Sequence, residues 1–249
     1  MGTKEKNTQS SENNTRKRPL TIGQVAVKVL AFLTAMAGAM VLLYLAFFSA
    51  VMNKNFLKDA NLKIGTHELL GMSEEDLEKV ALSMVLYTKS ETDTLQVQVT
   101  MDGEQRDFYN EKELIHIKDC RDLVTKVRIF IACCGGFFVL GTVVLCILKR
   151  PLELGGGFLV SCGVMILLGL VIGLAALIDI DGLIKGFHYM FFDNDLWLLD
   201  PRTDMVVWFF REEMYGKAVS AILMNLCGIF LPLGVASVGA LRMARGMKK

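Results

Sequence analysis

Four long stretches of this chain of 249 residues contain no Asp, Glu, Lys or Arg: residues 29–52, 129–148, 154–178 and 218–241. An α-helix rises about 1.5 Å per residue, so about 20 residues are needed to cross the roughly 30 Å hydrocarbon core of a bilayer. Uncharged runs of this length exclude a soluble domain and are too long for barrel strands, whereas helices satisfy their backbone groups within the membrane. The sequence therefore predicts four transmembrane helices.

Several motifs of nucleotide and hydrolase chemistry are also missing. The sequence has no Walker loop, no G-x-S-x-G elbow and no dinucleotide-binding fingerprint. Five of the six cysteines lie inside the four runs and only Cys120 lies outside them, so no disulfide framework is expected. A formal net charge of +1 gives no indication of nucleic-acid binding. We expect no cofactor and no nucleic-acid partner.

Lys and Arg residues near the ends of the runs indicate the orientation. Cytoplasmic flanks of membrane spans are enriched in these residues, and here they gather before the first run, at 149–150 and after the fourth run. We therefore expect an all-α transmembrane four-helix bundle with a small α+β extracytoplasmic cap. Its predicted parts are a disordered cytoplasmic tail at 1–22, spans at 23–52, 127–148, 154–178 and 217–241, extracytoplasmic segments at 53–126 and 179–216, and a cytoplasmic tail at 242–249.

Local signals in the first outer segment predict a helix followed by a hairpin. Ser73 and the three acidic residues after it are typical of a helix N-terminus, and apolar residues recur at helical spacing from 77 to 85. Apolar and polar residues then alternate from 95 to 101, and Asp102-Gly103 supplies a hairpin turn before a return strand that ends near Phe108.

Two histidines near the outer ends of the spans are the main candidates for chemistry. His116 lies in NEKELIHIKDCRDLV, which has the spacing of a helix running down to the second span, and Asp119 would be close enough to orient the imidazole by a hydrogen bond. His188 lies in GFHYMFFDNDLWLLDPRTD, whose aromatic residues suit the lipid headgroup layer. Imidazole titrates near neutrality, so the two side chains can pass a proton between groups.

The residue types alone leave other interpretations open. Both histidines can simply hydrogen-bond to backbone or lipid headgroups. A metal site of the two histidines with Asp195 or Asp200 lacks any H-x-x-x-H or H-E-x-x-H spacing. Cys120, on the same helix face as His116, is a candidate thiolate nucleophile.

The sequence DPRTD, residues 200–204, also has two interpretations. Asp followed by Pro predicts an Asp-initiated turn, because the proline fixes the backbone and the carboxylate can bond to it. Alternatively, Arg202 and the neighbouring acids shape a polar pocket that faces His188.

The two histidine segments together resemble the lipoprotein intramolecular transacylase family of Gram-positive bacteria. That family has an R/K-E-x-x-H-x-x-D-V helix before the second span and an F-H-x-x-F-F-x-x-D-x-W-x-x-D-P-x-T-D stretch before the fourth, and both segments occur here in this order. The resemblance covers the chain from about Gly23. The sequence departs from the family pattern at Cys120, where an apolar residue is usual, and at Arg211, where a proline is common.

The resemblance implies an enzyme that moves the sn-2 acyl chain of a diacylglyceryl-modified N-terminal cysteine onto the α-amino group of that cysteine, giving a lyso-form lipoprotein. Its partners would be diacylated lipoproteins as substrate and membrane phospholipid, with the active site at the extracytoplasmic face of the cell membrane. The residues matching the family's catalytic pair are His116 and His188. The predicted supporting residues are Asp119, Asp195, Trp197, Asp200, Arg202 and Asp204.

The chemistry of this transfer needs one group to accept a proton and another to supply one. An α-ammonium with a pKa of about 8 must lose a proton before its nitrogen attacks an ester. We predict His116 as the base and His188 as the acid or oxyanion stabiliser, and the sequence equally allows the reverse. The alternative function is that of a non-catalytic membrane protein, which binds lipid or a partner through its cap.

Overall fold

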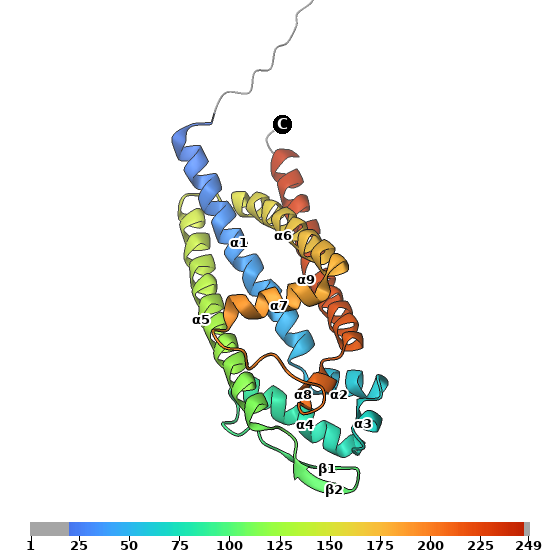
Figure 1. Cartoon of the computed structure of the whole chain (residues 1–249). Helices are drawn as coiled ribbons and strands as arrows, with labels where there is room; N and C mark the ends of the chain where they lie inside the picture. Colours follow the sequence, from blue (N-terminus) through green and yellow to red (C-terminus); the bar gives the residue numbers. More distant parts are fainter. Residues whose placement is uncertain (1–19, 247–249) are drawn as a thin grey trace, which may run out of the picture.

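The structure is a computed structural model and describes residues 20–246. Most of the tail predicted at 1–22 and the last three residues of the tail predicted at 242–249 lie outside the described residues. The elements are α1 (Ile22–Val51), α2 (Lys54–Lys63), α3 (Thr66–Leu69), α4 (Glu74–Thr88), β1 (Gln98–Met101), β2 (Glu104–Asp107), α5 (Glu111–Ile147), α6 (Leu152–Ile178), α7 (Ile180–Phe191), α8 (Val206–Phe209) and α9 (Glu212–Gly246). Figure 1 shows the long helices α1, α5, α6 and α9, with the short cap elements at one end and the beginning of α1 and the end of α9 at the other.

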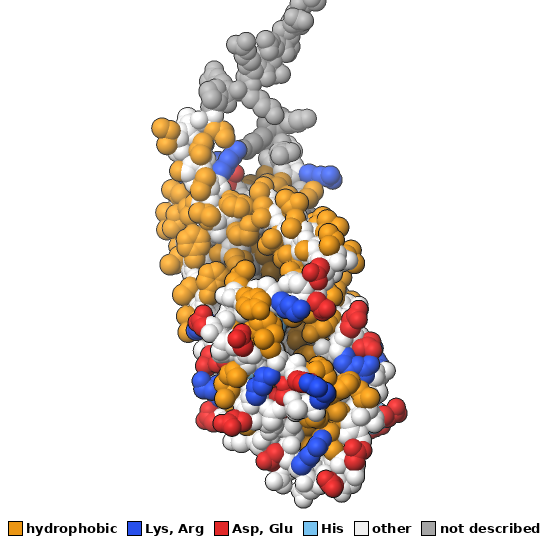
Figure 2. All heavy atoms as spheres, in the orientation of Figure 1, with side chains coloured by type: hydrophobic (Ala, Val, Ile, Leu, Met, Phe, Trp, Pro, Cys, Tyr) orange, Lys and Arg blue, Asp and Glu red, His pale blue; other side chains and the backbone are white. Residues whose placement is uncertain are grey.

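The four long helices α1, α5, α6 and α9 are each apolar and long enough to cross a membrane. Many of their large apolar side chains are exposed, and Figure 2 shows that apolar groups cover this part of the molecule while charged groups gather around the cap. A continuous apolar surface of this extent fits the hydrocarbon of a bilayer and not water. The predicted set of four membrane helices is present.

Helix α1 is the centre of the bundle, because it packs against α5, α6 and α9. Its buried face consists largely of small residues: Ala31, Ala35, Ala37, Ala39, Ala46 and Ala50. Facing it on α6 is Gly157, where an added Cβ would lie 2.5 Å from the carbonyl oxygen of Ala31. Small residues allow membrane helices to approach closely, and dispersion contacts along such a seam stabilise their association.

The cap, which we define as residues 53–110 together with α8, has a hydrophobic core of its own. Helix α4 begins after Ser73, whose side chain accepts a hydrogen bond from a backbone N–H of the first turn. Strands β1 and β2 are antiparallel, and Asp102 and Gly103 between them have positive φ angles of 50° and 83°, as a tight hairpin turn requires. The predicted helix and hairpin are both present. Buried core side chains include Leu77, Val80, Val99, Phe108 and Phe209.

Two parts of the chain differ from the boundaries that the sequence suggested. Helix α9 continues to Gly246, so the described residues 242–246 extend the last helix where a tail was expected. Within the predicted outer segment 179–216, residues 180–191 form helix α7, which the sequence analysis did not identify. Asp179 caps this helix by accepting a hydrogen bond from the Gly182 N–H. Helix α7 carries His188, so it decides the geometry of the site.

Candidate active site

A cavity of about 890 Å³ lies where the cap meets the long helices. Its walls come from the end of α1, from α2, α4, α5 and α7, from the beginning of α9 and from the segment that joins α7 to α9. Most of the lining side chains are apolar, as is usual in sites that bind large apolar ligands. The titratable and polar side chains among the lining residues are Thr88, His116, Cys120, Asp181, Lys185, His188, Trp197, Trp208, Arg211, Glu212, Glu213 and Tyr215.

The imidazole rings of His116 and His188 face each other in this cavity. Their centroids are 5.9 Å apart, and the ring planes are inclined by 35°. Phe192 contacts both rings, at centroid distances of 5.5 Å and 5.6 Å. Helix α5 supplies one histidine and α7 the other, so two residues far apart in the sequence meet at one point. A substrate group between them would lie within reach of both.

The ring of His188 is held in one orientation by three neighbours. Its Nδ1 lies 2.8 Å from the carbonyl oxygen of Ile184, and because a carbonyl can only accept, this nitrogen carries the proton. Trp197 stacks on the ring with a centroid distance of 4.7 Å, and Phe187 contacts it edge-on at 5.6 Å. The nitrogen left for chemistry is therefore Nε2.

His116 is buried, with 8% of the residue exposed. Burial lowers the pKa of its imidazole below 6.5, and the charges of His188 and Lys112 act in the same direction, while Asp119 opposes them. Its Nδ1 is buried without a hydrogen-bond partner in the described part of the chain. The ring is therefore neutral near neutral pH and keeps a lone pair that can accept a proton.

Cys120 lies beside His116, with its Sγ 3.7 Å from the Nε2 of the imidazole. Burial is the main reason that the pKa of the thiol is raised to about 12, and the charge of Asp119 adds to the effect. The thiolate is the nucleophilic form of cysteine. A thiol that stays protonated does not support the interpretation of Cys120 as a nucleophile.

Asp119 has a different role from the predicted one. Its carboxylate accepts a hydrogen bond of 2.9 Å from the side-chain amide of Asn194, and it makes no hydrogen bond to His116. The expected orienting contact within the helix is therefore wrong. The carboxylate instead ties the segment after α7 to the side of α5, and its charge reaches His116 through space.

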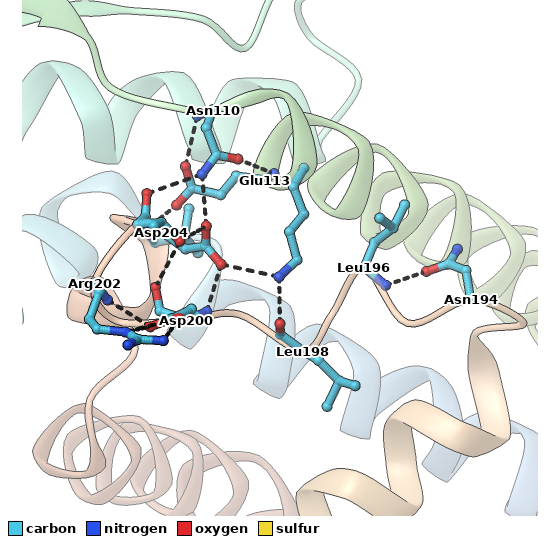
Figure 3. Close-up of polar contacts among 11 residues, drawn as sticks. Asn110, Glu113, Asn194, Leu196, Leu198, Asp200, Arg202 and Asp204 are labelled. Atoms are coloured by element: carbon cyan, nitrogen blue, oxygen red, sulfur yellow. Dashed lines mark hydrogen bonds and ion pairs between the residues drawn. The ribbon is translucent and has the colours of Figure 1, made fainter.

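Asp204 is the hub of a hydrogen-bond network that joins the segment between α7 and α8 to the start of α5 (Figure 3). Its side chain is 2% exposed. Its Oδ1 accepts from Asn110 at 2.8 Å, and its Oδ2 accepts from the Asp200 N–H at 2.6 Å and from Lys112 at 3.3 Å. Burial raises its pKa, but the hydrogen bonds from the Asp200 N–H, Asn110, Thr203 and Lys112 outweigh this, so the pKa is lowered.

Glu113 is a site-supporting residue that the sequence analysis did not identify. It is fully buried, and its carboxylate accepts from the Val206 N–H at 2.6 Å and from the Asn110 N–H at 2.8 Å. The side chain of Asn110 in turn accepts from the Glu113 N–H, which completes a capping box. The N-x-x-E spacing was a signal for the helix start. The contact with Val206 joins α5 to α8.

The remaining predicted supporting residues, Asp195, Asp200 and Arg202, are not among the cavity-lining residues. Asp200 and Arg202 form an ion pair of 2.6 Å in the turn, where the Arg202 side chain is 87% exposed. Neither is among the cavity-lining residues, so the structure does not support the alternative of a polar pocket shaped by Arg202. The side chain of Asp195 is exposed at the start of the same segment. Within residues 20–246, no cluster of three His, Cys, Asp or Glu side chains could hold a metal ion.

Four membrane-spanning helices, with a pair of facing histidines near one end of them, define an integral, multi-pass membrane protein. A family model described as lipoprotein intramolecular transacylase Lit matches residues 32–215, and the chain belongs to this family.

Solved structures of the membrane-integral lipoprotein intramolecular transacylase Lit from Bacillus cereus have the same fold. One aligns with a TM-score of 0.73 and 17% identity, covering 89% of this chain and 98% of that one. Two others are variants of that protein with one histidine replaced. The alanine variant aligns with a TM-score of 0.70 and 17% identity, covering 89% of this chain and 96% of that one. The arginine variant aligns with a TM-score of 0.71 and 16% identity, covering 90% of this chain and 96% of that one. A search of curated proteins finds no match.

Proposed function

We propose that this protein transfers the sn-2 acyl chain from the diacylglyceryl group of a lipoprotein's N-terminal cysteine to the α-amino nitrogen of the same cysteine. The observation that carries the proposal is the pair of imidazoles, 5.9 Å apart, in a cavity lined mainly by apolar side chains. Such a cavity suits acyl chains, and paired imidazoles suit the proton transfers of ester aminolysis. Membership of the transacylase family supports the same reaction.

His116 acts as the base in this proposal. The α-ammonium group of the substrate, whose pKa is about 8, first releases one proton to water. The amine nitrogen then attacks the carbonyl carbon of the sn-2 ester. The lowered pKa of His116 keeps its imidazole neutral, so it can take the second proton from the nitrogen as the N–C bond forms. Amine and ester belong to one molecule, so holding them in contact removes much of the entropic cost of the reaction.

His188 acts as the acid. A positive charge on His188 lowers the pKa of His116, so the ring of His116 stays neutral while His188 holds the proton that it donates. The Nδ1–H of His188 is engaged with the Ile184 carbonyl, which leaves the Nε2–H to protonate the glyceryl oxygen as its bond to the acyl carbon breaks. Both products, an amide and an alcohol, are neutral. The transfer requires no nucleotide.

We place the histidines and the cap at the extracytoplasmic face of the cell membrane, with both chain ends in the cytoplasm. The basic residues at 149–150 and at the two ends of the sequence support this orientation. Diacylated lipoproteins carry their modified cysteine at that face of the membrane. Substrate lipoprotein and the surrounding phospholipid would both approach the cavity from the bilayer.

The experiment uses bacteria that lack any other N-acylating enzyme. Mass spectrometry of the N-terminal lipopeptide of an abundant lipoprotein is compared for the wild type, His116→Ala and His188→Ala. We expect an N-acyl, S-monoacylglyceryl peptide with the wild type and its loss with both variants, while the variants still accumulate in the membrane. The matched control is Arg202→Ala, an exposed change in the same segment, which we expect to keep activity.

A diacylglyceryl peptide that stays unchanged in the presence of folded wild-type protein would refute the transacylase. The alternative, a non-catalytic protein that binds lipid or a partner through its cap, would then be favoured. Full activity of His116→Ala would leave the reaction standing but would refute the assigned base.

A further inference from the structure

The cavity is lined by the only two tryptophans of the chain, and only one of them has its N–H satisfied. The indole N–H of Trp208 donates to the carbonyl oxygen of Pro201 at 3.1 Å. The Nε1 of Trp197 is buried without a hydrogen-bond partner in the described residues, and the residue is 8% exposed. Buried donors are nearly always paired, so an unpaired one at a cavity wall calls for an acceptor that arrives from outside the chain.

Trp197 is held against the ring of His188. Its ring stacks on His188 with a centroid distance of 4.7 Å and an interplanar angle of 24°, and Tyr189 contacts it edge-on at 5.0 Å. The carbonyl of Leu198, the next residue, accepts a hydrogen bond from Lys112 of α5. The donor therefore has a fixed position beside the ring that we assign as the acid, which is what pre-organised stabilisation of a developing charge requires.

The substrate chemistry of the proposed function supplies the missing acceptor. A diacylglyceryl group offers ester carbonyl oxygens, and attack by the amine turns one of them into an oxyanion. In a mainly apolar cavity this charge needs hydrogen-bond donors aimed at it. The free N–H of His188 is already committed to the departing glyceryl oxygen, so it cannot fully serve the oxyanion as well.

We propose that the indole N–H of Trp197 donates a hydrogen bond to the carbonyl oxygen of the sn-2 ester and to the oxyanion formed from it, which makes Trp197 a third catalytic residue. The inference rests on the transacylase function proposed above. As the N–C bond forms, the π electrons of the carbonyl move to this oxygen. When the C=O bond re-forms, the bond to the glyceryl oxygen breaks. The ammonium has already released one proton to water, His116 takes the second from the attacking nitrogen, His188 gives one to the glyceryl oxygen, and Trp197 keeps its proton throughout.

The test replaces the N–H alone. Because the chain has two tryptophans, Trp197 is the only one left in the Trp208→Phe variant. Production of this variant in a tryptophan auxotroph supplied with 3-benzothienylalanine puts sulfur in place of the N–H and keeps the bicyclic shape. The purified protein with and without the analogue is assayed on a synthetic diacylglyceryl-cysteine lipopeptide. Trp197→Phe in the otherwise natural chain is measured in parallel, as a second variant that does not depend on Trp208→Phe folding.

We expect kcat to fall about 100-fold when sulfur replaces the N–H, as on loss of one oxyanion donor, with KM and the unfolding temperature nearly unchanged. Trp197→Phe should lose kcat to a similar extent. A sulfur analogue as active as its tryptophan counterpart, or a loss of kcat matched by a fall in unfolding temperature, would overturn the assignment. The activity of the wild type distinguishes failure of this proposal from failure of the proposed function. If the wild type and the sulfur analogue are both active, only the role of Trp197 is refuted. If the wild type is inactive, the transacylase function is refuted and the role of Trp197 with it.

Discussion

The burial of His116 couples its protonation to the stability of the protein. Its pKa in the folded protein is below the ordinary 6.5, mainly because burial disfavours the charged ring. Between the two values the unfolded chain binds more protons, so the free energy of unfolding falls as the pH is lowered through 6.5 towards the folded pKa. Above 6.5 both states are neutral and this contribution vanishes.

We therefore predict that His116→Gln flattens the dependence of unfolding temperature on pH. Wild-type protein in detergent should lose stability between about pH 8 and about pH 5.5, and the variant should lose less, because glutamine does not titrate. Thermal unfolding followed by circular dichroism at several pH values measures both curves. Parallel curves would contradict the lowered pKa.

Asp204 and Arg202 lie two residues apart in the same turn but differ in burial. The Asp204 carboxylate is buried and accepts from Asn110, Lys112 and the Asp200 N–H. Asp204→Ala leaves these donors without an acceptor, so we expect it to cost about 3 kcal/mol of stability. Arg202→Ala removes an exposed ion pair and should leave the unfolding temperature unchanged. Equal effects of the two changes would show that the network does not hold the segment.

Spacing along the chain predicted the two histidines but not the partners of the acids around them. An i, i+3 spacing on a helix suggested that Asp119 contacts His116, yet the carboxylate binds Asn194, which lies 75 residues away in the sequence. The burial of Glu113 likewise depends on Val206, which comes from another segment. Local rules find residues that share a helix face, whereas these partners are decided by how distant segments dock.

The close approach of α1 and α6 can be tested by adding a single methyl group, through substitution of glycine by alanine. At Gly157 an added Cβ would lie 2.5 Å from the Ala31 carbonyl oxygen, whereas at Gly163, on the same helix, nothing lies within 4 Å. Alanine favours a helix over glycine by about 1 kcal/mol. We expect Gly163→Ala to be neutral or stabilising, and Gly157→Ala to destabilise by about 1–3 kcal/mol because the helices must separate. Thermal unfolding in detergent gives both values, and stabilisation by Gly157→Ala would refute the tight contact.

Elements that depend on local signals were predictable from the sequence. Uncharged runs identified the four long helices, and the Ser73 cap and the Asp102-Gly103 turn identified α4 and the hairpin. Helix α7 was not predicted, because the aromatic residues of this segment were used only to place it at the lipid headgroup layer. Its aromatic rings are largely exposed, and what makes it important is that it carries His188 towards α5.

At the scale of the whole molecule, the proposed orientation can be tested by cysteine labelling. In a variant without the six native cysteines, Glu104→Cys in the hairpin and Lys149→Cys between α5 and α6 introduce thiols at exposed positions near opposite ends of the bundle. A membrane-impermeant maleimide added to intact cells should label Glu104→Cys and should reach Lys149→Cys only after permeabilisation. The reverse pattern would place the cap and the histidines in the cytoplasm.

The continuous helix α5 and the position of α7 after α6 have a consequence for biogenesis. His116 precedes two membrane spans and His188 follows them, so the chain has to cross the bilayer twice between the two histidines. During synthesis the first imidazole is in place long before the second. A nascent chain that has inserted α5 but not yet α6 and α7 cannot bring the two histidines together. The hydrogen bond from Asn110 to Asp204 forms later still, because Asp204 follows α7 in the sequence. The proposed acyl transfer therefore cannot begin until α7 and the segment after it have been synthesised and inserted, so a chain terminated before α7 would be inactive.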